Sequence, residues 1–413
     1  MFFIYQLTIL IIILFLPIII IVRIFKNKEN INSFKEKIGV ISKVRKKGTL
    51  VWFHCASVGE LMSIIPLIKH YENKSFIKQI LITTNTLSST NIFYKYKFKK
   101  TVHQFFPIDF IFISKKFLNY WRPQIAIFVE SEIWPSFFKE LNKKDIPLIL
   151  LNARITKKTF NKWYKFHDFS NSVFKNISAS YPQNIETFNY LKKLNVKKIR
   201  YLGNLKYVEN LIDKKNSIEK KLIVKFKNFK TWIAASTHAG EEIVCAKSHI
   251  ILKKKIDNLI TIIIPRHIHR VNEIISKIEN LNLKVTLYSS KNIDLNDTDI
   301  YIVDAYGVSK DFYKISNTVF LGGSLSNKGG QNPIEPARLG AQILHGKNIH
   351  NFKDVYKHLN ILKISKKIKN ENDIASSIIF SSLKKNKSRI KKVGEEIFKK
   401  TTTELDQLIK NEF

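Results

Sequence analysis

The sequence predicts an α/β protein made of two doubly wound, Rossmann-like domains with a cleft between them, preceded by a membrane helix. Three observations lead to this fold class. Residues 2–22 are almost wholly apolar and carry no charge. Short runs rich in Val and Ile alternate with amphipathic stretches, which is typical of parallel sheets covered on both faces. A polar, lysine-rich stretch near 206–229 interrupts this alternation, and 413 residues are enough for two domains.

The N-terminal apolar segment is long enough to cross a membrane. At about 1.5 Å per residue, residues 2–22 span a bilayer core of about 30 Å, and such a helix tolerates Pro17. Arg23, Lys26 and Lys28 follow at once, so the positive-inside rule places the remainder in the cytoplasm. A cleaved signal peptide is the alternative, but the segment lacks a basic start and a small-residue cleavage site. We therefore expect a single-pass anchor at residues 1–22, whose removal leaves a foldable two-domain body.

The rest of the chain divides into two domains and two linkers. A basic linker, 23–48, leads to an N-terminal domain at 49–205, a second linker at 206–229 and a C-terminal domain at 230–413. The strands predicted for the N-terminal domain are 50–56, 78–84, 125–130 and 147–151, with helices at 60–74 and 133–144. Those of the C-terminal domain are 231–236, 260–265, 284–288, 300–303, 318–322 and 341–345, followed by a helical region at 372–413. In such sheets ligands bind beyond the carboxyl ends of the strands.

The charge and the cysteine content limit the class of protein. The formal net charge of +37 attracts polyanions such as nucleic acid, anionic lipid or phosphorylated substrates. Compositional drift is the alternative, because lysine far outnumbers arginine, and arginine is preferred for bidentate phosphate recognition. Cys55 and Cys245 indicate a reducing compartment without a disulfide framework.

The turn after the first predicted strand reads Ser57-Val58-Gly59-Glu60. A serine followed three residues later by a glutamate is a capping box, which satisfies backbone donors at a helix start. The alternative is a catalytic carboxylate, because the turn joins a strand to a helix at the edge where ligands bind.

Two further turns of the N-terminal domain carry charged side chains. Glu130-Ser131-Glu132 follows a predicted strand, and two carboxylates so close together raise each other's pKa, which suits acid or base work. The alternative is an acidic helix start, with Pro135 at the first helical position. Gly203-Asn204-Leu205-Lys206 ends the domain, and its lysine either binds a phosphate or is a solvated linker residue.

Polar turns also follow strands in the C-terminal domain. Ser236-Thr237-His238-Ala239-Gly240 precedes a predicted helix, where the hydroxyl groups form either an anion nest or ordinary caps. Pro265-Arg266-His267 lies beyond another strand, and its arginine either binds a phosphate or lies on the surface.

Glycines mark the last candidate site. Gly322-Gly323-Ser324 and Gly329-Gly330 permit close approach of the backbone to a ligand. Asn332-Pro333-Ile334-Glu335 follows, and its glutamate either holds a ribose diol or belongs to a helix cap.

Taken in order, these motifs resemble the Kdo transferase family, inverting glycosyltransferases of the GT-B fold that transfer an acidic eight-carbon sugar. The resemblance runs from the N-terminal anchor to about residue 360. Its most specific stretches are HCASVGE (54–60), ESEIWP (130–135), LNARIT (151–156), GNLKY (203–207), STHAGEE (236–242), PRHIHR (265–270) and GGQNPIEPA (329–337). The chain departs from the usual family residues at Ser136, Val208, Val308 and Gln331, which puts the details of nucleotide contact in doubt.

The resemblance implies a role for each candidate residue. Glu60 is the general base that deprotonates the acceptor hydroxyl, and Glu130 and Lys206 stabilise charge at the reaction centre. The residues implied to bind CMP-Kdo are Ser236, Thr237, Pro265, Arg266, Tyr306, Gly307, Val308, Gly323, Ser324, Asn332, Pro333, Ile334 and Glu335, the last on the ribose. No metal and no cofactor are expected, because lysine, arginine and helix N-termini can stabilise the CMP phosphate.

The resemblance also implies the partners. The donor is CMP-Kdo and the acceptor is a lipid A precursor, lipid IVA, in lipopolysaccharide core biosynthesis. The anchor is expected in the inner membrane, with the catalytic domains facing the cytoplasm against anionic lipid and with no nucleic acid partner. The alternatives are another GT-B transferase or an epimerase that uses a UDP sugar, and a non-catalytic, membrane-tethered anion-binding protein.

Overall fold

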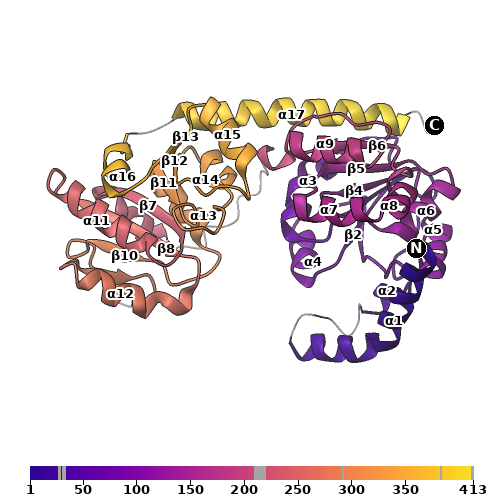
Figure 1. Ribbon diagram of the computed structural model, residues 1–413, viewed down its shortest axis with the longest axis horizontal. Coiled ribbons are helices and arrows are strands. Elements are labelled where there is room, and N and C mark those ends of the chain that lie inside the picture. The colour runs from indigo at the N-terminus through magenta and orange to yellow at the C-terminus, as the bar shows by residue number, and fades with distance from the viewer. Residues whose placement is uncertain (27–28, 30–33, 209–219, 291–292, 382–383, 411–413) are drawn as a thin grey trace. The chain divides into compact units, whose positions relative to one another are not determined.

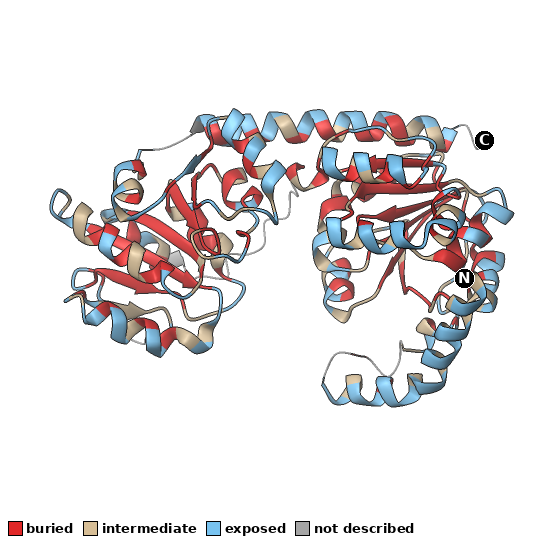
Figure 2. Ribbon diagram, in the orientation of Figure 1, coloured by how far each residue is buried: buried red, intermediate tan, exposed pale blue. Residues whose placement is uncertain are grey.

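The computed structural model describes residues 1–413 except 27–28, 30–33, 209–219, 291–292, 382–383 and 411–413 (Figure 1). The chain forms two compact units. The first comprises Met1–Asn210 with Gly394–Phe413, and the second comprises Leu211–Val393. Each contains a parallel sheet whose strands are almost entirely buried beneath helices (Figure 2). The predicted Rossmann-like layout is therefore confirmed.

The first unit contains a six-stranded parallel sheet in the order β3-β2-β1-β4-β5-β6. Its strands are β1 (Leu50–His54), β2 (Gln79–Thr84), β3 (Thr101–Phe105), β4 (Ile125–Val129), β5 (Leu148–Ala153) and β6 (Ala179–Pro182). The helices between them are α3 (Val58–Glu72), α4 (Leu87–Tyr94), α5 (Ile111–Trp121), α6 (Pro135–Lys143), α7 (Lys157–Lys165), α8 (His167–Phe174) and α9 (Ile185–Lys193). Trp52 on β1 lies at the centre of the core, with its ring centroid 5.1 Å from those of Phe117 and Phe128.

The second unit contains a seven-stranded parallel sheet in the order β13-β12-β11-β7-β8-β10-β9. Its strands are β7 (Lys230–Thr237), β8 (Leu259–Pro265), β9 (Val285–Leu287), β10 (Ile300–Ile302), β11 (Thr318–Leu321), β12 (Gln342–His345) and β13 (Ser365–Lys367). Its helices are α10 (Lys220–Lys225), α11 (Glu241–Lys253), α12 (Val271–Glu279), α13 (Ser309–Phe312), α14 (Ile334–Arg338), α15 (Lys353–Ile361) and α16 (Glu371–Ser377). All six strands predicted for this part of the chain are present.

The C-terminal helix α17 (Lys384–Lys410) ends on the first unit. Leu405 and Ile409 are fully buried, and Tyr181 on β6 donates a hydrogen bond of 3.2 Å to Glu404. The sequence assigns residues 230–413 to the C-terminal domain, whereas these contacts join the last turns of α17 to the first unit. Residues 209–219 of the predicted linker at 206–229 lie outside the described residues.

The N-terminal helix α1 (Phe2–Phe25) is, among the described residues, the one helix long and apolar enough to cross a membrane. Ile20 is its one buried residue. Its first turn nevertheless contacts the first unit, because the Tyr5 hydroxyl donates a 2.6 Å hydrogen bond to Asp109. The sequence treats residues 1–22 as a separate anchor, whereas this contact joins the first turn of α1 to the first unit.

Candidate functional site

The first candidate site lies where the strand order of the first sheet reverses. β1 and β4 are neighbours although two strands, β2 and β3, lie between them in the chain, and doubly wound sheets bind ligands at such a switch point. Glu60 lies in the turn after β1, and Glu130 directly follows β4. The carboxyl ends of these two strands therefore bring together residues that are far apart in the sequence.

Glu60 is the third residue of α3 and helps to cap the start of this helix. Its carboxylate accepts hydrogen bonds from the backbone N–H groups of Ala56 (2.6 Å) and Ser57 (3.4 Å), and the Ser57 hydroxyl accepts from the Glu60 N–H (3.3 Å). The capping interpretation is therefore confirmed. Burial, followed by the charges of Glu132 and Glu130, raises the pKa of the same carboxyl from 4.5 to about 7. A capping carboxylate with such a pKa is also suited to take a proton near neutral pH.

Glu132 is held beside this site by two side chains that sequence reasoning did not single out. The Nε2 atom of His54 lies 3.0 Å from Glu132 Oε2, and Trp134 Nε1 donates to the same oxygen over 2.9 Å. His54 is fully buried at the end of β1, where its ring stacks 3.8 Å from that of Phe106. A histidine that ends an otherwise apolar strand was the available signal for this role.

Glu130 forms an ion pair with Lys206 of 2.6 Å, and both residues were predicted for the site. Asn152, at the end of β5, donates to Glu130 over 3.4 Å and accepts from the Leu205 N–H over 3.0 Å. Glu130 and Asn152 have φ angles of 59° and 51°, a region that few residues other than glycine adopt. This backbone conformation turns both side chains toward the segment that carries Lys206.

The raised pKa of Glu60 predicts a pH dependence of catalysis. A general base acts only when deprotonated, so a catalytic role of Glu60 predicts that kcat/KM rises between about pH 6 and 8 with a midpoint near 7. Glu132→Gln keeps an acceptor for His54 but removes a charge, so the midpoint should move to lower pH. Initial rates across this range test both statements, and a profile that is flat from about pH 6 to 8 would contradict them.

The second candidate site lies at the carboxyl ends of β7, β8 and β11, which are neighbours in the second sheet. Ser236 has a φ of 55°, and a side chain on Gly322 would overlap its carbonyl oxygen. The Thr237 hydroxyl is buried without a hydrogen-bond partner among the described residues. Arg266 is exposed and donates its backbone N–H to the Thr237 carbonyl over 3.0 Å. The structure therefore brings the predicted strand-end residues together.

Glu241, at the start of α11, organises this edge of the second sheet. It is 2% exposed and accepts backbone hydrogen bonds from His238, Gly323, Leu325 and Ser326, with lengths of 2.7–3.0 Å. A single carboxylate thus holds the loop after β11 against the turn after β7. The sequence shows Glu241 within its motif, but nothing local reveals that three of its backbone donors lie more than 80 residues away.

The remaining predicted donor residues differ in exposure. Glu335 on α14 is exposed, Tyr306 is 70% exposed, and the space beside Gly307 is open. Val308 is 8% exposed. Ser324 is fully buried, and its hydroxyl donates to the Leu321 carbonyl over 2.5 Å, so it shapes the loop. Asn332 accepts from the Ile334 N–H over 3.1 Å and forms a turn with Pro333 between them. In the described ranges no three His, Cys, Asp or Glu side chains are arranged to hold a metal ion.

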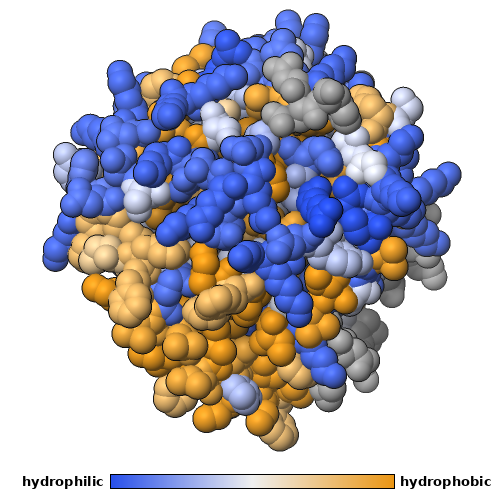
Figure 3. Space-filling model, turned by 90° about the vertical axis from the view of Figure 1, so that its right-hand side faces the viewer, coloured by the Kyte–Doolittle hydropathy of each residue, from blue (hydrophilic) through white to orange (hydrophobic). Residues whose placement is uncertain are grey.

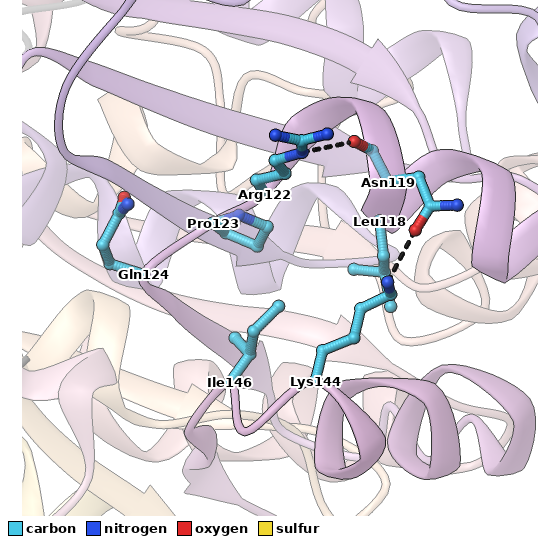
Figure 4. A pocket seen from close by; sticks show the side chains of 7 residues that line it. All are labelled: Leu118, Asn119, Arg122, Pro123, Gln124, Lys144 and Ile146. Atoms are coloured by element: carbon cyan, nitrogen blue, oxygen red, sulfur yellow. Dashed lines mark hydrogen bonds between the residues drawn. The ribbon is translucent and has the colours of Figure 1, made fainter.

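A pocket of about 430 Å³ lies elsewhere on the first unit (Figure 4). It is lined by Leu118, Asn119, Arg122, Pro123, Gln124, Lys144 and Ile146. Gln124 precedes β4 and Ile146 precedes β5, so the pocket lies at the amino ends of these strands. Because Glu60 and Glu130 follow the carboxyl ends, this pocket is not part of the candidate site.

Known proteins resemble the chain in both sequence and fold. The family described as 3-Deoxy-D-manno-octulosonic-acid transferase (kdotransferase) matches residues 32–209. The 3-deoxy-D-manno-octulosonic acid transferase of Rickettsia bellii (strain RML369-C) is 31% identical over 94% of this chain and 93% of its own length.

Two solved structures share the fold. A UDP-GlcNAc 2-epimerase from Neisseria meningitidis is 13% identical, covers 84% of this chain and 94% of its own, and has a TM-score of 0.55. A glycosyltransferase from Rickettsia africae ESF-5 is also 13% identical, covers 89% and 100%, and has a TM-score of 0.55. The structural likeness shows the fold, and the sequence likeness shows that the chain belongs to the 3-deoxy-D-manno-octulosonic acid transferase family.

Proposed function

We propose that this protein transfers Kdo from CMP-Kdo to a lipid A precursor, lipid IVA, with inversion at the anomeric carbon. The observation that carries the proposal is the carboxyl group of Glu60, whose pKa lies near 7 at the switch point of the first sheet. The ion pair of Glu130 and Lys206 on the neighbouring strand end supports it. Membership of the family supplies the chemical class of the donor and of the acceptor.

The reaction needs a base because a sugar hydroxyl is a poor nucleophile at neutral pH. Glu60 takes the acceptor proton while the acceptor oxygen forms its bond to the anomeric carbon of Kdo. The bond from that carbon to the phosphate oxygen breaks, and CMP leaves with the electron pair. Attack on the face opposite CMP inverts the configuration in one step. Lys206, held by Glu130, places a positive charge where negative charge develops.

The second unit is proposed to hold the donor. Arg266 is exposed beyond β8, and the start of α11 after the turn at Ser236–Gly240 presents backbone N–H groups that favour an anion. Glu335 is exposed on α14, where its carboxylate can accept hydrogen bonds from the two hydroxyl groups of a ribose.

Arg266→Ala and Glu335→Ala are each expected to weaken CMP binding by about ten- to a hundredfold, because a charged hydrogen bond contributes about 1.5–3 kcal/mol. Titration calorimetry with CMP measures the effect. Glu279→Ala, an exposed glutamate at the end of α12, is the control and should bind as the wild type does. A chelator should leave CMP affinity and transfer unchanged. Wild-type affinity in both variants, or strict dependence on a divalent ion, would refute the assignment.

The acceptor is lipid-linked, so the protein is proposed to act at the cytoplasmic face of the inner membrane. The apolar helix α1 supports insertion into the bilayer, and Arg23 and Lys26 at its end suit anionic head groups. The decisive assay combines the purified full-length chain, CMP-Kdo and lipid IVA, with the products identified by mass spectrometry. Competition by CMP but not by UDP would exclude a UDP-sugar transferase or epimerase, and absence of product would leave only anion binding.

A further inference from the structure

The first turn of α1 is built into the first unit. Asp109 is 1% exposed and accepts the Tyr5 hydroxyl through Oδ2. The same carboxylate accepts the backbone N–H groups of Ser136 and Phe137, each over 2.9 Å, and so caps α6. Burial raises the pKa of Asp109, and separation from Tyr5 would remove a hydroxyl donor from this buried carboxylate.

Gln6 strengthens this attachment from the next position. Its side-chain oxygen accepts the Ile111 N–H over 2.9 Å at the start of α5, and its amide donates to the Ser136 hydroxyl over 2.8 Å. The ammonium of Lys139 lies 4.2 Å from the ring centroid of Phe2. The first turn of α1 therefore satisfies groups at the starts of two helices of the first unit.

The other end of α1 reaches the same region. Arg23 pairs with Glu29 over 3.1 Å, and Lys37 pairs with Glu29 over 2.5 Å. The Lys37 carbonyl accepts the backbone N–H of Ile108 over 2.8 Å, and Ile108 is the neighbour of Asp109. Both ends of the helix are thus connected to one short segment of the first unit.

A crossing helix cannot make these contacts. Crossing would place Tyr5 and Arg23, about 27 Å apart along a straight helix, at opposite faces of a hydrocarbon layer of about 30 Å. The first unit would then have to contact Tyr5 on one side of the bilayer and Arg23 on the other. A charged domain does not enter hydrocarbon, so the two attachments require both helix ends on one side.

The middle of α1 is apolar and largely exposed, although Ile20 is buried. Its most exposed large side chains include Phe3, Leu7, Leu14, Phe15, Ile18, Ile21 and Phe25. In Figure 3, apolar side chains cover the lower part of the visible face, which is where α1 lies. A helix without a polar face is suited to immersion in hydrocarbon rather than to the head-group layer. Pro17 removes a backbone donor inside the helix, and Figure 1 shows α1 changing direction along its length.

We propose that α1 is embedded in one leaflet and does not cross the bilayer, so that both of its ends stay on the side of the catalytic units. The acyl chains of that leaflet surround the apolar middle of α1. This topology differs from the single crossing that the sequence predicts, and it rests on the proposed membrane association. Through Gln6 and Ser136 it also connects the embedded helix to the start of α6, the helix that follows Glu130 and Glu132.

Cysteine labelling of the full-length chain tests the topology. Phe2→Cys reports on the start of α1, and Lys26→Cys is the matched control because both topologies place it in the cytoplasm. Background is low because Cys55 and Cys245 are fully buried and burial raises the pKa of both thiols. A membrane-impermeant maleimide is expected to label both variants in inverted inner-membrane vesicles and neither in spheroplasts. Labelling of Phe2→Cys in spheroplasts would overturn the proposal.

If the maleimide labels Phe2→Cys neither in inverted vesicles nor in spheroplasts, cross-linking distinguishes the two topologies. The double variant Phe2→Cys/Lys139→Cys joins two neighbouring side chains and should form an intramolecular cross-link in the membrane-bound chain. Phe2→Cys/Lys193→Cys, with its second cysteine on α9, is the control that should not. Absence of the first cross-link in membranes would overturn the proposal. Recovery of the chain in the soluble fraction after carbonate extraction would instead refute the membrane association itself, so the two failures are distinguishable.

Discussion

Replacement of Glu60 by glutamine is expected to lower kcat by about 10²–10⁴, which is the usual loss when a general base is removed. Glutamine keeps the size of the side chain and an oxygen that can accept the N–H groups of Ala56 and Ser57. It cannot take a proton from the acceptor hydroxyl. The fold and the affinity for CMP should therefore be preserved while transfer is lost.

Ser57→Ala is the matched control for this experiment. It removes the hydroxyl that accepts the Glu60 N–H and so breaks half of the capping box without touching the carboxylate. Loss of a cap costs about 0.5–2 kcal/mol of stability, and transfer should stay within a fewfold of the wild type. If Glu60→Gln behaves like Ser57→Ala, with normal transfer and a small loss of stability, Glu60 is only a capping residue. Single-turnover rates and thermal unfolding of both variants separate these outcomes.

Replacement of Glu241 by alanine is expected to have the largest effect on the second unit. Four backbone N–H groups lose their acceptor, and each buried donor left unpaired costs about 1–3 kcal/mol. The loss of about 4 kcal/mol or more is comparable with the whole stability of a domain, which is about 5–15 kcal/mol. We expect the unfolding transition of this unit to move to much lower temperature and CMP binding to be lost.

Two variants make the Glu241 prediction specific. Glu241→Gln retains one acceptor oxygen but turns an NH₂ group toward backbone donors, so its effect should be intermediate. Glu279→Ala removes an exposed glutamate from the same unit and should change stability by less than about 0.5 kcal/mol. Calorimetry and CMP titration measure all three variants. A Tm of Glu241→Ala within a degree or two of the wild type would show that the loop after β11 does not depend on this carboxylate.

Sequence patterns predicted most strands of both units. All six predicted strands of the second unit are present because Val- and Ile-rich runs mark each of them. Three strands were not predicted: β13 (Ser365–Lys367) of the second unit, and β3 (Thr101–Phe105) and β6 (Ala179–Pro182) of the first. Three of the five residues of β3 are polar, and the buried ring of His103 is hydrogen-bonded to the Thr84 hydroxyl over 2.9 Å. β6 is short and ends in proline, so tertiary burial rather than local pattern makes it a strand.

The sequence by itself determined the alternation of strands and helices, the apolar character of α1, and the polar turns that carry Glu60, Glu130, Lys206 and Arg266. These features depend only on the composition and spacing of residues that are close together in the sequence, so they can be recognised without the fold. Tertiary structure alone decided which distant groups meet: Glu132 with His54, Glu241 with the loop after β11, the end of α17 with β6, and Tyr5 with Asp109. The physical reason is that a buried carboxylate needs donors, and the fold supplies them from segments whose sequence carries no mark of the pairing.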